Sequence, residues 1–187
     1  MKIIYKLSNK TKPTLFLDRD GVINKVRSGV YITSTKMIKI YPSFIKGFKK
    51  LDLSKYHLII ITNQSAINRG FMTMKKGIEI NNYIIKILKD NNIIINAVYF
   101  CPHRPDEGCN CRKPQTGLIE EAKKDFNIDF EKSYYFGDKK TDMELAKKVG
   151  IKSVFLLTGE GKKYINKLDF KPDFVLYNLK NVYKILK

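Results

Sequence analysis

The chain has 187 residues, of which 43% are apolar, and a chain of this length can bury the core of one domain. Lys and Arg number 36 against 18 Asp and Glu, which gives a net charge of +18. This charge favours anionic partners such as nucleic acid, acidic lipid or phosphorylated metabolites. A Lys-rich background composition explains it equally well, because the lysines are spread along the whole chain. No stretch reaches the roughly 20 apolar residues of a membrane span or has the pattern of a signal peptide, so we expect a cytoplasmic protein without membrane contact.

Short apolar runs alternate with helical patterns along the chain. The runs are β-branched or aromatic and lack polar alternation, which is typical of strands buried on both faces of a parallel sheet. They comprise residues 15–17, 58–61, 97–100, 134–136 and 153–157. Helical stripes lie between them, namely after Pro42, after candidate caps at Thr73 and Thr116, and over residues 139–149. The alternation predicts an α/β protein, specifically a three-layer α/β/α sandwich with a parallel sheet.

We expect residues 1–187 to form a single domain, because no repeat, linker or low-complexity run interrupts the chain. Its core covers about residues 14–160. A loop over residues 101–111 holds all three cysteines. The C-terminal extension, about residues 160–187, is expected to add a strand near residues 174–176 and a last helix, and no chemistry is assigned to it. A monomer is favoured.

Two carboxylates, Asp18 and Asp20, follow the first predicted strand, and Gly21 comes next. Asp18 can attack phosphorus and form an acyl phosphate, while Asp20 can protonate the leaving oxygen and then deprotonate water. Gly21 lets the backbone turn sharply towards a substrate. Since attack by an anion on a phosphate dianion is electrostatically opposed, this chemistry requires a divalent cation beside Asp18, and Mg²⁺ suits such an open site. The alternative is an ordinary polar turn or helix cap.

Polar residues also follow the later predicted strands, where ligands bind in open α/β sheets. The Thr62 hydroxyl and the amides of Asn63 and its neighbours can donate to phosphate, although a helix cap is an equal alternative for Thr62. Lys113 offers a point charge that can hold the phosphate and offset the charge of Asp18. Asp138 and Asp142 share one face of a helix's first turn, where acidic residues ordinarily stabilise the helix dipole.

Four motifs resemble those of the haloacid dehalogenase (HAD) superfamily, in the family's order, and the resemblance covers about residues 14–160. They are Asp18-Arg-Asp-Gly-Val-Ile-Asn24, Thr62-Asn-Gln-Ser65, Arg112-Lys-Pro114 and Gly137-Asp-Lys-Lys-Thr-Asp142. The resemblance implies a Rossmann-like, HAD-like fold and a phosphatase with Asp18 as nucleophile and Asp20 as acid and base. It also implies that Thr62 and Lys113 bind the transferring phosphoryl group.

The same resemblance implies the magnesium site. Asp18, Asp138 and the backbone carbonyl of Asp20 would hold the ion. Asp142 would support the metal's waters or Lys139.

Four candidate zinc ligands lie close together in the sequence: Cys101, His103, Cys109 and Cys111. These soft or borderline ligands suffice for a closed tetrahedral Zn²⁺ site, which implies a structural role because no position remains for a catalytic water. Redox cysteines or four unrelated residues are the alternatives. The loop leads directly into Arg112, so a metal ion bound to the loop would fix the Arg112 side chain over the cleft.

This loop resembles the branch of the superfamily that contains heptose 1,7-bisphosphate phosphatases and histidinol-phosphate phosphatases, in which a zinc loop stands in for a large cap domain. The stretch from Thr62 to Gly70 resembles the heptose enzymes but departs from them at Ala66 and Asn68. Heptose bisphosphate is therefore favoured over histidinol phosphate. Arg112 and Arg69 could hold its second phosphate through bidentate contacts, although surface solvation is an equal alternative for Arg69.

Two other classes compete with a phosphatase acting on a small phosphorylated sugar. The charge of +18 is compatible with a polynucleotide end-processing phosphatase, but this requires a basic groove with exposed aromatic residues, and most aromatics here lie in apolar runs. A zinc-stabilised interaction module without activity is the other class. The intact Asp18, Asp20, Thr62, Lys113 and Asp138 argue against it.

Overall fold

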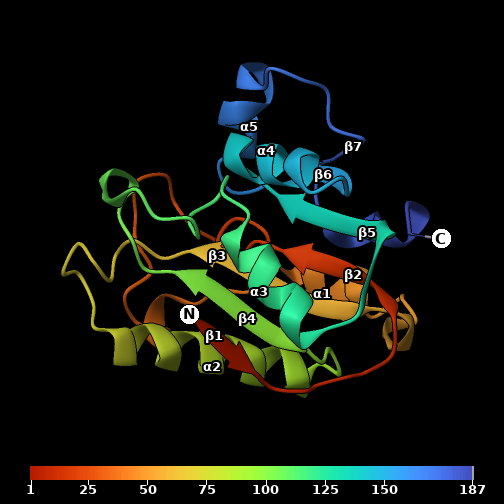
Figure 1. Ribbon diagram of the computed structural model, residues 1–187, viewed down its shortest axis with the longest axis horizontal. Helices are drawn as coiled ribbons and strands as arrows, with labels where there is room; N and C mark the ends of the chain where they lie inside the picture. The colour runs from red at the N-terminus through yellow and green to blue at the C-terminus, as the bar shows by residue number, and fades with distance from the viewer. Residues whose placement is uncertain (187) are drawn as a thin grey trace.

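The computed structural model describes residues 1–186, which form a seven-stranded sheet in the order β1-β4-β3-β2-β5-β6-β7 (Figure 1). The strands are β1 (Lys2–Ile4), β2 (Lys12–Leu17), β3 (His57–Asn63), β4 (Ala97–Cys101), β5 (Ile128–Gly137), β6 (Lys152–Leu156) and β7 (Phe174–Leu176). All neighbouring strands are parallel except β1, which pairs antiparallel with β4. The helices are α1 (Pro42–Phe48), α2 (Met74–Asp90), α3 (Gly117–Asp125), α4 (Lys140–Lys148) and α5 (Gly161–Tyr164). Short 3₁₀ turns are η1 (Thr35–Met37), η2 (Leu53–Lys55), η3 (Pro105–Glu107), η4 (Ile165–Lys167) and η5 (Leu179–Lys184).

The sheet is buried on both faces, as its continuous apolar strands predict. Side chains alternate along β2, where Leu15 and Leu17 pack on one face and Phe16 on the other. The face of Leu15 is covered by α1 and α2, and the opposite face by α3 and α4 (Figure 1). The three-layer sandwich predicted from the sequence is therefore confirmed.

Several local predictions differ from the structure. Strand β1 was not expected, because its three residues carry no pattern of their own and it forms by pairing with β4. The Thr73 hydroxyl caps α2 by accepting from Lys76 N at 3.1 Å, as predicted. Thr116 makes no such cap at α3, because it already has a helical backbone conformation with φ −87° and ψ −6°.

The C-terminal extension adds the predicted strand β7 and the predicted last helix, which is the 3₁₀ helix η5. The backbone of Asn181 departs from helical geometry and interrupts the turn. The turn packs against α1 so closely that a Cβ on Gly47 would lie 1.8 Å from the Leu179 carbonyl oxygen. Among residues 1–186, no helix combines the length and apolar character needed to cross a membrane.

The parallel strands β2, β3, β5 and β6 end at the same edge of the sheet. The chain leaves β2 at Asp18, β5 at Asp138 and β6 at Leu157. Polar segments that lie far apart in the sequence are thereby brought together at this edge.

Candidate active site

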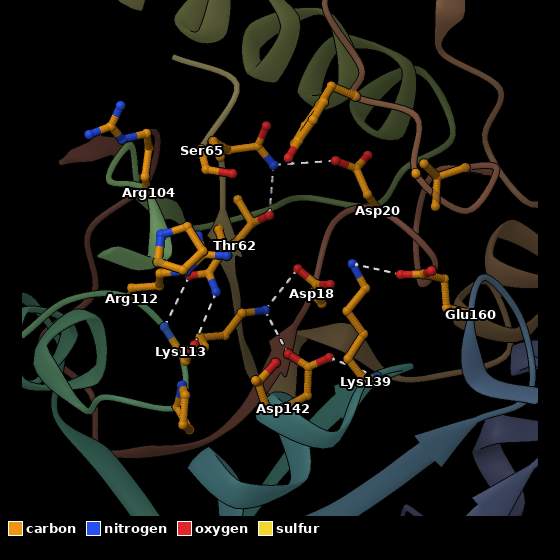
Figure 2. A pocket seen from close by; sticks show the side chains of 18 of the residues that line it. Asp18, Asp20, Thr62, Ser65, Arg104, Arg112, Lys113, Lys139, Asp142 and Glu160 are labelled. Carbon is orange, nitrogen blue, oxygen red and sulfur yellow. Dashed lines mark hydrogen bonds and ion pairs between the residues drawn. The ribbon is translucent and has the colours of Figure 1, made fainter. Parts of the chain in front are cut away.

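An open cavity of about 790 Å³ lies at the carboxyl ends of the parallel strands. Asp18, Asp20, Thr62, Lys113 and Asp142 line it (Figure 2). Two loops also contribute lining residues, namely residues 26–32 after β2 and several residues between 104 and 115 after β4. Several residues between 160 and 164 after β6 line it as well, so the cavity receives groups from five different segments of the chain.

Three carboxylates meet beside this cavity, where Asp18 and Asp142 line it and Asp138 is fully buried. Oxygens of Asp18, Asp138 and Asp142 lie within 4.8 Å of one another, and all three side chains are buried. Asp138 Oδ2 accepts a hydrogen bond from Glu160 N at 2.7 Å, whereas the buried Oδ1 has no hydrogen-bond partner within residues 1–186. Gly21, at φ +99°, approaches so closely that a Cβ there would lie 2.2 Å from Asp138 Oδ2. A group of carboxylate oxygens, one of them buried without a hydrogen-bond partner, fits a hard cation such as Mg²⁺.

The electrostatics of the three carboxylates lead to the same conclusion. Burial raises the pKa of Asp138 well above its usual range, and the nearby charges of Asp18 and Asp142 raise it further. Burial also raises the pKa of Asp142, as does the charge of Asp18, although Lys113 opposes both. A bound divalent cation would offset this repulsion and keep the carboxylates ionised.

Lys113 lies between two of these carboxylates. Its Nζ is 2.9 Å from Asp18 Oδ1 and 2.7 Å from Asp142 Oδ1, and it donates to the Ile61 carbonyl at 2.9 Å (Figure 2). Burial lowers the pKa of Lys113, but the charges of Asp142 and Asp18 outweigh it and hold the pKa well above its usual range. Lys113 is therefore a fixed ammonium beside the candidate nucleophile.

Asn63 and Asp142 anchor this lysine. Asn63 Oδ1 accepts from Lys113 N at 3.0 Å, and Asn63 Nδ2 donates to Lys113 O at 3.2 Å. Asn63 thus holds the backbone of Lys113. Asp142 pairs with the Lys113 ammonium and accepts from Lys139 N at 3.1 Å, while the Lys139 ammonium turns to Glu160 at 3.2 Å. The partnership of Asp142 with Lys113 was not expected from the sequence.

Asp20 lies at the cavity wall and accepts hydrogen bonds from three side chains. Arg19 donates to it at 2.6 Å, Asn24 at 3.1 Å and Gln64 at 3.3 Å. Burial raises the pKa of Asp20, but the charge and hydrogen bonds of these partners, chiefly Arg19, lower it overall. Gln64 Nε2 also donates to Thr62 Oγ1 at 2.9 Å, so the Thr62 hydroxyl keeps its own proton available for an anion.

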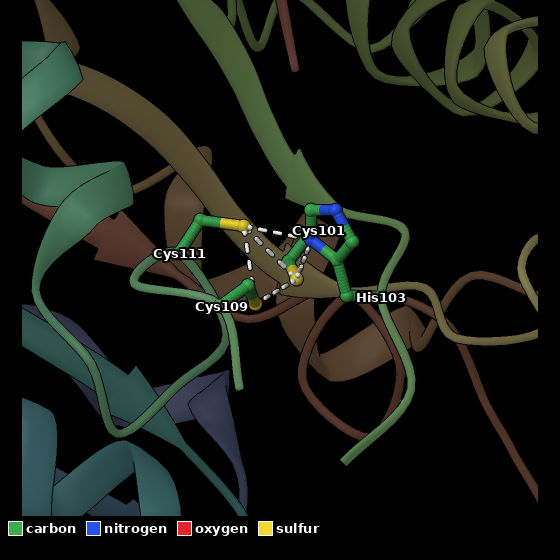
Figure 3. A group of neighbouring side chains, drawn as sticks. All are labelled: Cys101, His103, Cys109 and Cys111. Carbon is green, nitrogen blue, oxygen red and sulfur yellow. Dashed lines mark hydrogen bonds between the residues drawn. The ribbon is translucent and has the colours of Figure 1, made fainter. Parts of the chain in front are cut away.

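The four predicted zinc ligands form a second cluster beside the cavity (Figure 3). Cys101 Sγ lies 3.2 Å from Cys111 Sγ and 3.6 Å from Cys109 Sγ, and His103 Nδ1 lies 3.2 Å from Cys111 Sγ. Tetrahedral zinc with Zn–S bonds of about 2.3 Å separates its sulfur ligands by about 3.8 Å, so the cluster needs only slight expansion to hold the ion. Burial raises the pKa of Cys109, but N–H groups of Cys111 and Arg112 lower it overall to about 7, which favours a thiolate.

The two predicted arginines differ in position. Arg112 lines the cavity, and its Nη1 donates to the His103 carbonyl at 3.2 Å, so the cysteine loop positions it. Arg69 is exposed and does not line the cavity. Sequence reasoning missed Glu160, whose carboxylate bridges Lys139 and Ser28 across the cavity. Its position shortly after β6 was an available signal, because the other site residues also follow strands of this sheet.

Comparisons with known proteins show the family of this chain. Residues 110–182 match the model of the HAD-hydrolase-like family. A protein of Thermoplasma acidophilum named "Probable D-glycero-D-manno-heptose-1,7-bisphosphate 7-phosphatase" is 41% identical over 152 residues, which span 81% of this chain and 94% of that protein. This chain belongs to the HAD-like family of phosphatases. The fold and enzyme class implied by the sequence motifs are thus confirmed.

Two further relatives of this HAD-like phosphatase carry similar names. The D-glycero-beta-D-manno-heptose-1,7-bisphosphate 7-phosphatase of Helicobacter pylori is 38% identical over 149 residues, covering 79% of this chain and 84% of that protein. The crystal structure of D,D-heptose 1,7-bisphosphate phosphatase from B. bronchiseptica, which contains magnesium and phosphate, superimposes with a TM-score of 0.85 at 26% identity. The match covers 93% of this chain and 97% of that one.

Proposed function

We propose that this HAD-like phosphatase is a Mg²⁺-dependent phosphomonoester hydrolase that acts through an aspartyl phosphate on Asp18. Its proposed substrate is D-glycero-D-manno-heptose 1,7-bisphosphate, cleaved at the 7-phosphate. The observation that carries the mechanism is the placement of Asp18 in the cavity, with its Oδ1 2.9 Å from the Lys113 ammonium and a carboxylate oxygen within 4.8 Å of one from the buried Asp138. A carboxylate in this position can reach a phosphate while its own charge is offset.

The cation would be held by Asp18, Asp138 and the backbone carbonyl of Asp20. When bound, Mg²⁺ supplies charge neutralisation for the phosphate dianion. Lys113 and the Thr62 hydroxyl bind and orient the phosphate oxygens. Asp142 keeps Lys113 charged and in place, since it lies 2.7 Å from its ammonium.

The reaction then needs two displacements at phosphorus. The first starts from the protonated form of Asp20: an Asp18 oxygen bonds to phosphorus, the bond to the sugar oxygen breaks, and Asp20 gives its proton to that oxygen. In the second, Asp20 takes a proton from water, the water oxygen bonds to phosphorus, and the bond to Asp18 breaks. A proton donor and acceptor of this kind contributes about 10²–10⁴-fold to a rate.

Several observations support a small bisphosphorylated sugar. The relatives named above act, by their names, on heptose bisphosphate. The cavity is large enough for a sugar with a second phosphate. Arg112 offers a guanidinium on the cavity wall that can bind this phosphate, and the cysteine loop fixes its position. We assign Zn²⁺ on the Cys101–Cys111 loop the structural role of holding Arg112. Arg69 could contribute only if the surface loop that carries it moves towards the cavity.

A phosphate-release screen under Mg²⁺ tests the proposal. Its substrates are both anomers of the heptose bisphosphate, histidinol phosphate and a 3′-phosphorylated oligonucleotide, and we expect one heptose anomer to give the highest kcat/KM. Asp18→Asn should lower kcat by about 10⁵-fold, as the loss of a nucleophile does in other hydrolases. Asp52→Asn, which changes an exposed carboxylate away from the cavity, is the matched control. Full activity of Asp18→Asn would contradict the mechanism, and preference for another substrate would contradict the substrate assignment.

A further inference from the structure

Arg19 has a charged side chain that is buried beside the site and has no role in the proposed mechanism. It is 1% exposed and does not line the cavity, so it cannot be a direct ligand of the substrate. Its Nη1 donates to Asn81 Oδ1 on α2 at 2.8 Å. Its Nη2 donates to Asp20 Oδ2 at 2.6 Å and to Gln64 Oε1 at 2.7 Å. A buried guanidinium is costly unless its partners are well placed, so these contacts define where the side chain can lie.

The contacts distinguish the two oxygens of Asp20. Oδ2 accepts from Arg19 and also from Gln64 Nε2 at 3.3 Å, whereas Oδ1 accepts only from Asn24 Nδ2 at 3.1 Å among residues 1–186. Because arginine does not give up its protons, an Oδ2 bonded to Arg19 remains an acceptor. Oδ1, which accepts from fewer donors, is then the oxygen that can take up a proton.

We infer that Arg19 is a positioning residue which, held by Asn81 and Gln64, orients Asp20 so that Oδ1 exchanges the proton in both displacements. This inference rests on the proposed function. Proton transfer requires the Asp20 oxygen to lie within hydrogen-bond reach of the leaving oxygen and then of the water. The same amide of Gln64 bonds Thr62 Oγ1, so the network also sets Asp20 relative to the phosphate-binding hydroxyl. Asn81 ties this arrangement to the long helix α2, which lies outside the cavity.

The two displacements respond differently to a displaced Asp20 when the leaving group needs no proton. With p-nitrophenyl phosphate, the Asp18 oxygen bonds to phosphorus and p-nitrophenolate leaves as a stabilised anion, so the first displacement proceeds without Asp20. The second displacement still needs Asp20 to take the proton of water. A positioning defect therefore slows only the second displacement, whereas a general loss of active protein lowers both phases together.

The experiment is a rapid-mixing measurement of p-nitrophenolate release by the full chain under saturating Mg²⁺. In Arg19→Gln we expect a burst of about one equivalent per active site, followed by a steady-state rate about 100-fold below that of the wild type. Arg19→Lys, which keeps the charge but loses the planar fork, should retain the burst with a smaller loss. Lys140→Gln removes a cation that pairs with surface carboxylates outside the cavity, and should change neither phase.

Asn81→Asp provides a second variant in case Arg19→Gln does not fold. It keeps the shape of Asn81 and offers Arg19 a competing carboxylate, so we expect a retained burst and a steady-state loss of about tenfold. If, in the folded variants, burst and steady-state rate fall by the same factor or do not fall, Arg19 only stabilises the fold and this inference alone is overturned. If the wild type releases no product under Mg²⁺, the proposed function fails and this inference fails with it.

Discussion

The two candidate metal clusters of this protein are assembled in opposite ways. The carboxylate cluster collects Asp18, Asp138 and Asp142 from segments separated by more than half the chain, whereas residues 101–111 contain every member of the thiolate cluster. The first exists only because β2 and β5 are parallel neighbours that end at the same edge. The second depends on one loop. A site assembled from several strands therefore holds its charges in the rigid core. A metal bound to one loop can stabilise that loop without rearranging the core.

The clusters also differ in what they do to stability. Three buried carboxylates repel one another, and Lys113 pairs with only Asp18 and Asp142 among them, so without a metal ion the carboxylate cluster opposes folding and serves chemistry. Bound zinc would close a loop and add folding free energy. We therefore expect changes in the carboxylate cluster to affect mainly kcat, and changes in the thiolate cluster to affect mainly stability and KM.

Asp138→Asn should give the largest difference between the effect on kcat and the effect on stability. Removing one Mg²⁺ ligand is expected to lower kcat by about 10³-fold, because metal charge contributes several kcal/mol to the transition state. In the absence of Mg²⁺, relief of like-charge repulsion should raise the free energy of unfolding by about 1–3 kcal/mol. Steady-state kinetics against Mg²⁺ concentration and thermal unfolding without metal measure the two quantities. A variant with lower stability and a normal kcat would contradict the assignment of this cluster to catalysis rather than to stability.

Cys111→Ser should produce the opposite pattern. We expect it to lose bound zinc, to lower the unfolding temperature by about 5–10 °C, and to raise KM for the bisphosphate about tenfold through loss of the loop that holds Arg112. The kcat should stay within about threefold, because Asp18 and Lys113 remain in place. Zinc content by mass spectrometry, thermal unfolding and kinetics test this. A drop in kcat as large as that of Asp138→Asn would show that the clusters are not separable.

Arg112→Lys sharpens the role of the cysteine loop. It keeps the positive charge but removes bidentate contact with a phosphate and the hydrogen bond to the His103 carbonyl. KM for a sugar bisphosphate should rise about tenfold, while KM for the corresponding monophosphate should change by less than about twofold. The exposed Lys124→Gln on α3 is the charge control. Equal changes for both substrates would place Arg112 away from the second phosphate.

Ser28→Ala tests the wall opposite the cysteine loop and should have the smallest effect. The Ser28 hydroxyl donates to Glu160 at 2.5 Å and joins the loop after β2 to the segment after β6. Loss of this partly exposed bond should raise KM about threefold and leave kcat unchanged. Kinetics with the preferred substrate measure the change. An effect on kcat larger than that on KM would mean that Glu160 acts on Lys139 and the carboxylate cluster rather than on the cavity wall.

The local sequence pattern was sufficient to predict a large part of the structure of this protein. The buried strands could be predicted because a run such as residues 58–61 is apolar on both faces, and the grouping of three cysteines and one histidine because they lie within residues 101–111. Strand β1, which has no pattern of its own and depends on its pairing with β4, was missed.

Residue types and their order along the chain determined the fold class, the candidate nucleophile and the composition of both clusters. The tertiary structure alone decided the pairing of Lys113 with Asp142, the exclusion of Arg69 from the cavity wall and the contacts of Arg19 with Asp20. The physical reason is the range of the interactions. Hydrophobic periodicity acts between near neighbours and can be read from sequence, whereas hydrogen bonds and ion pairs act over about 3 Å between segments that only the folded sheet brings together.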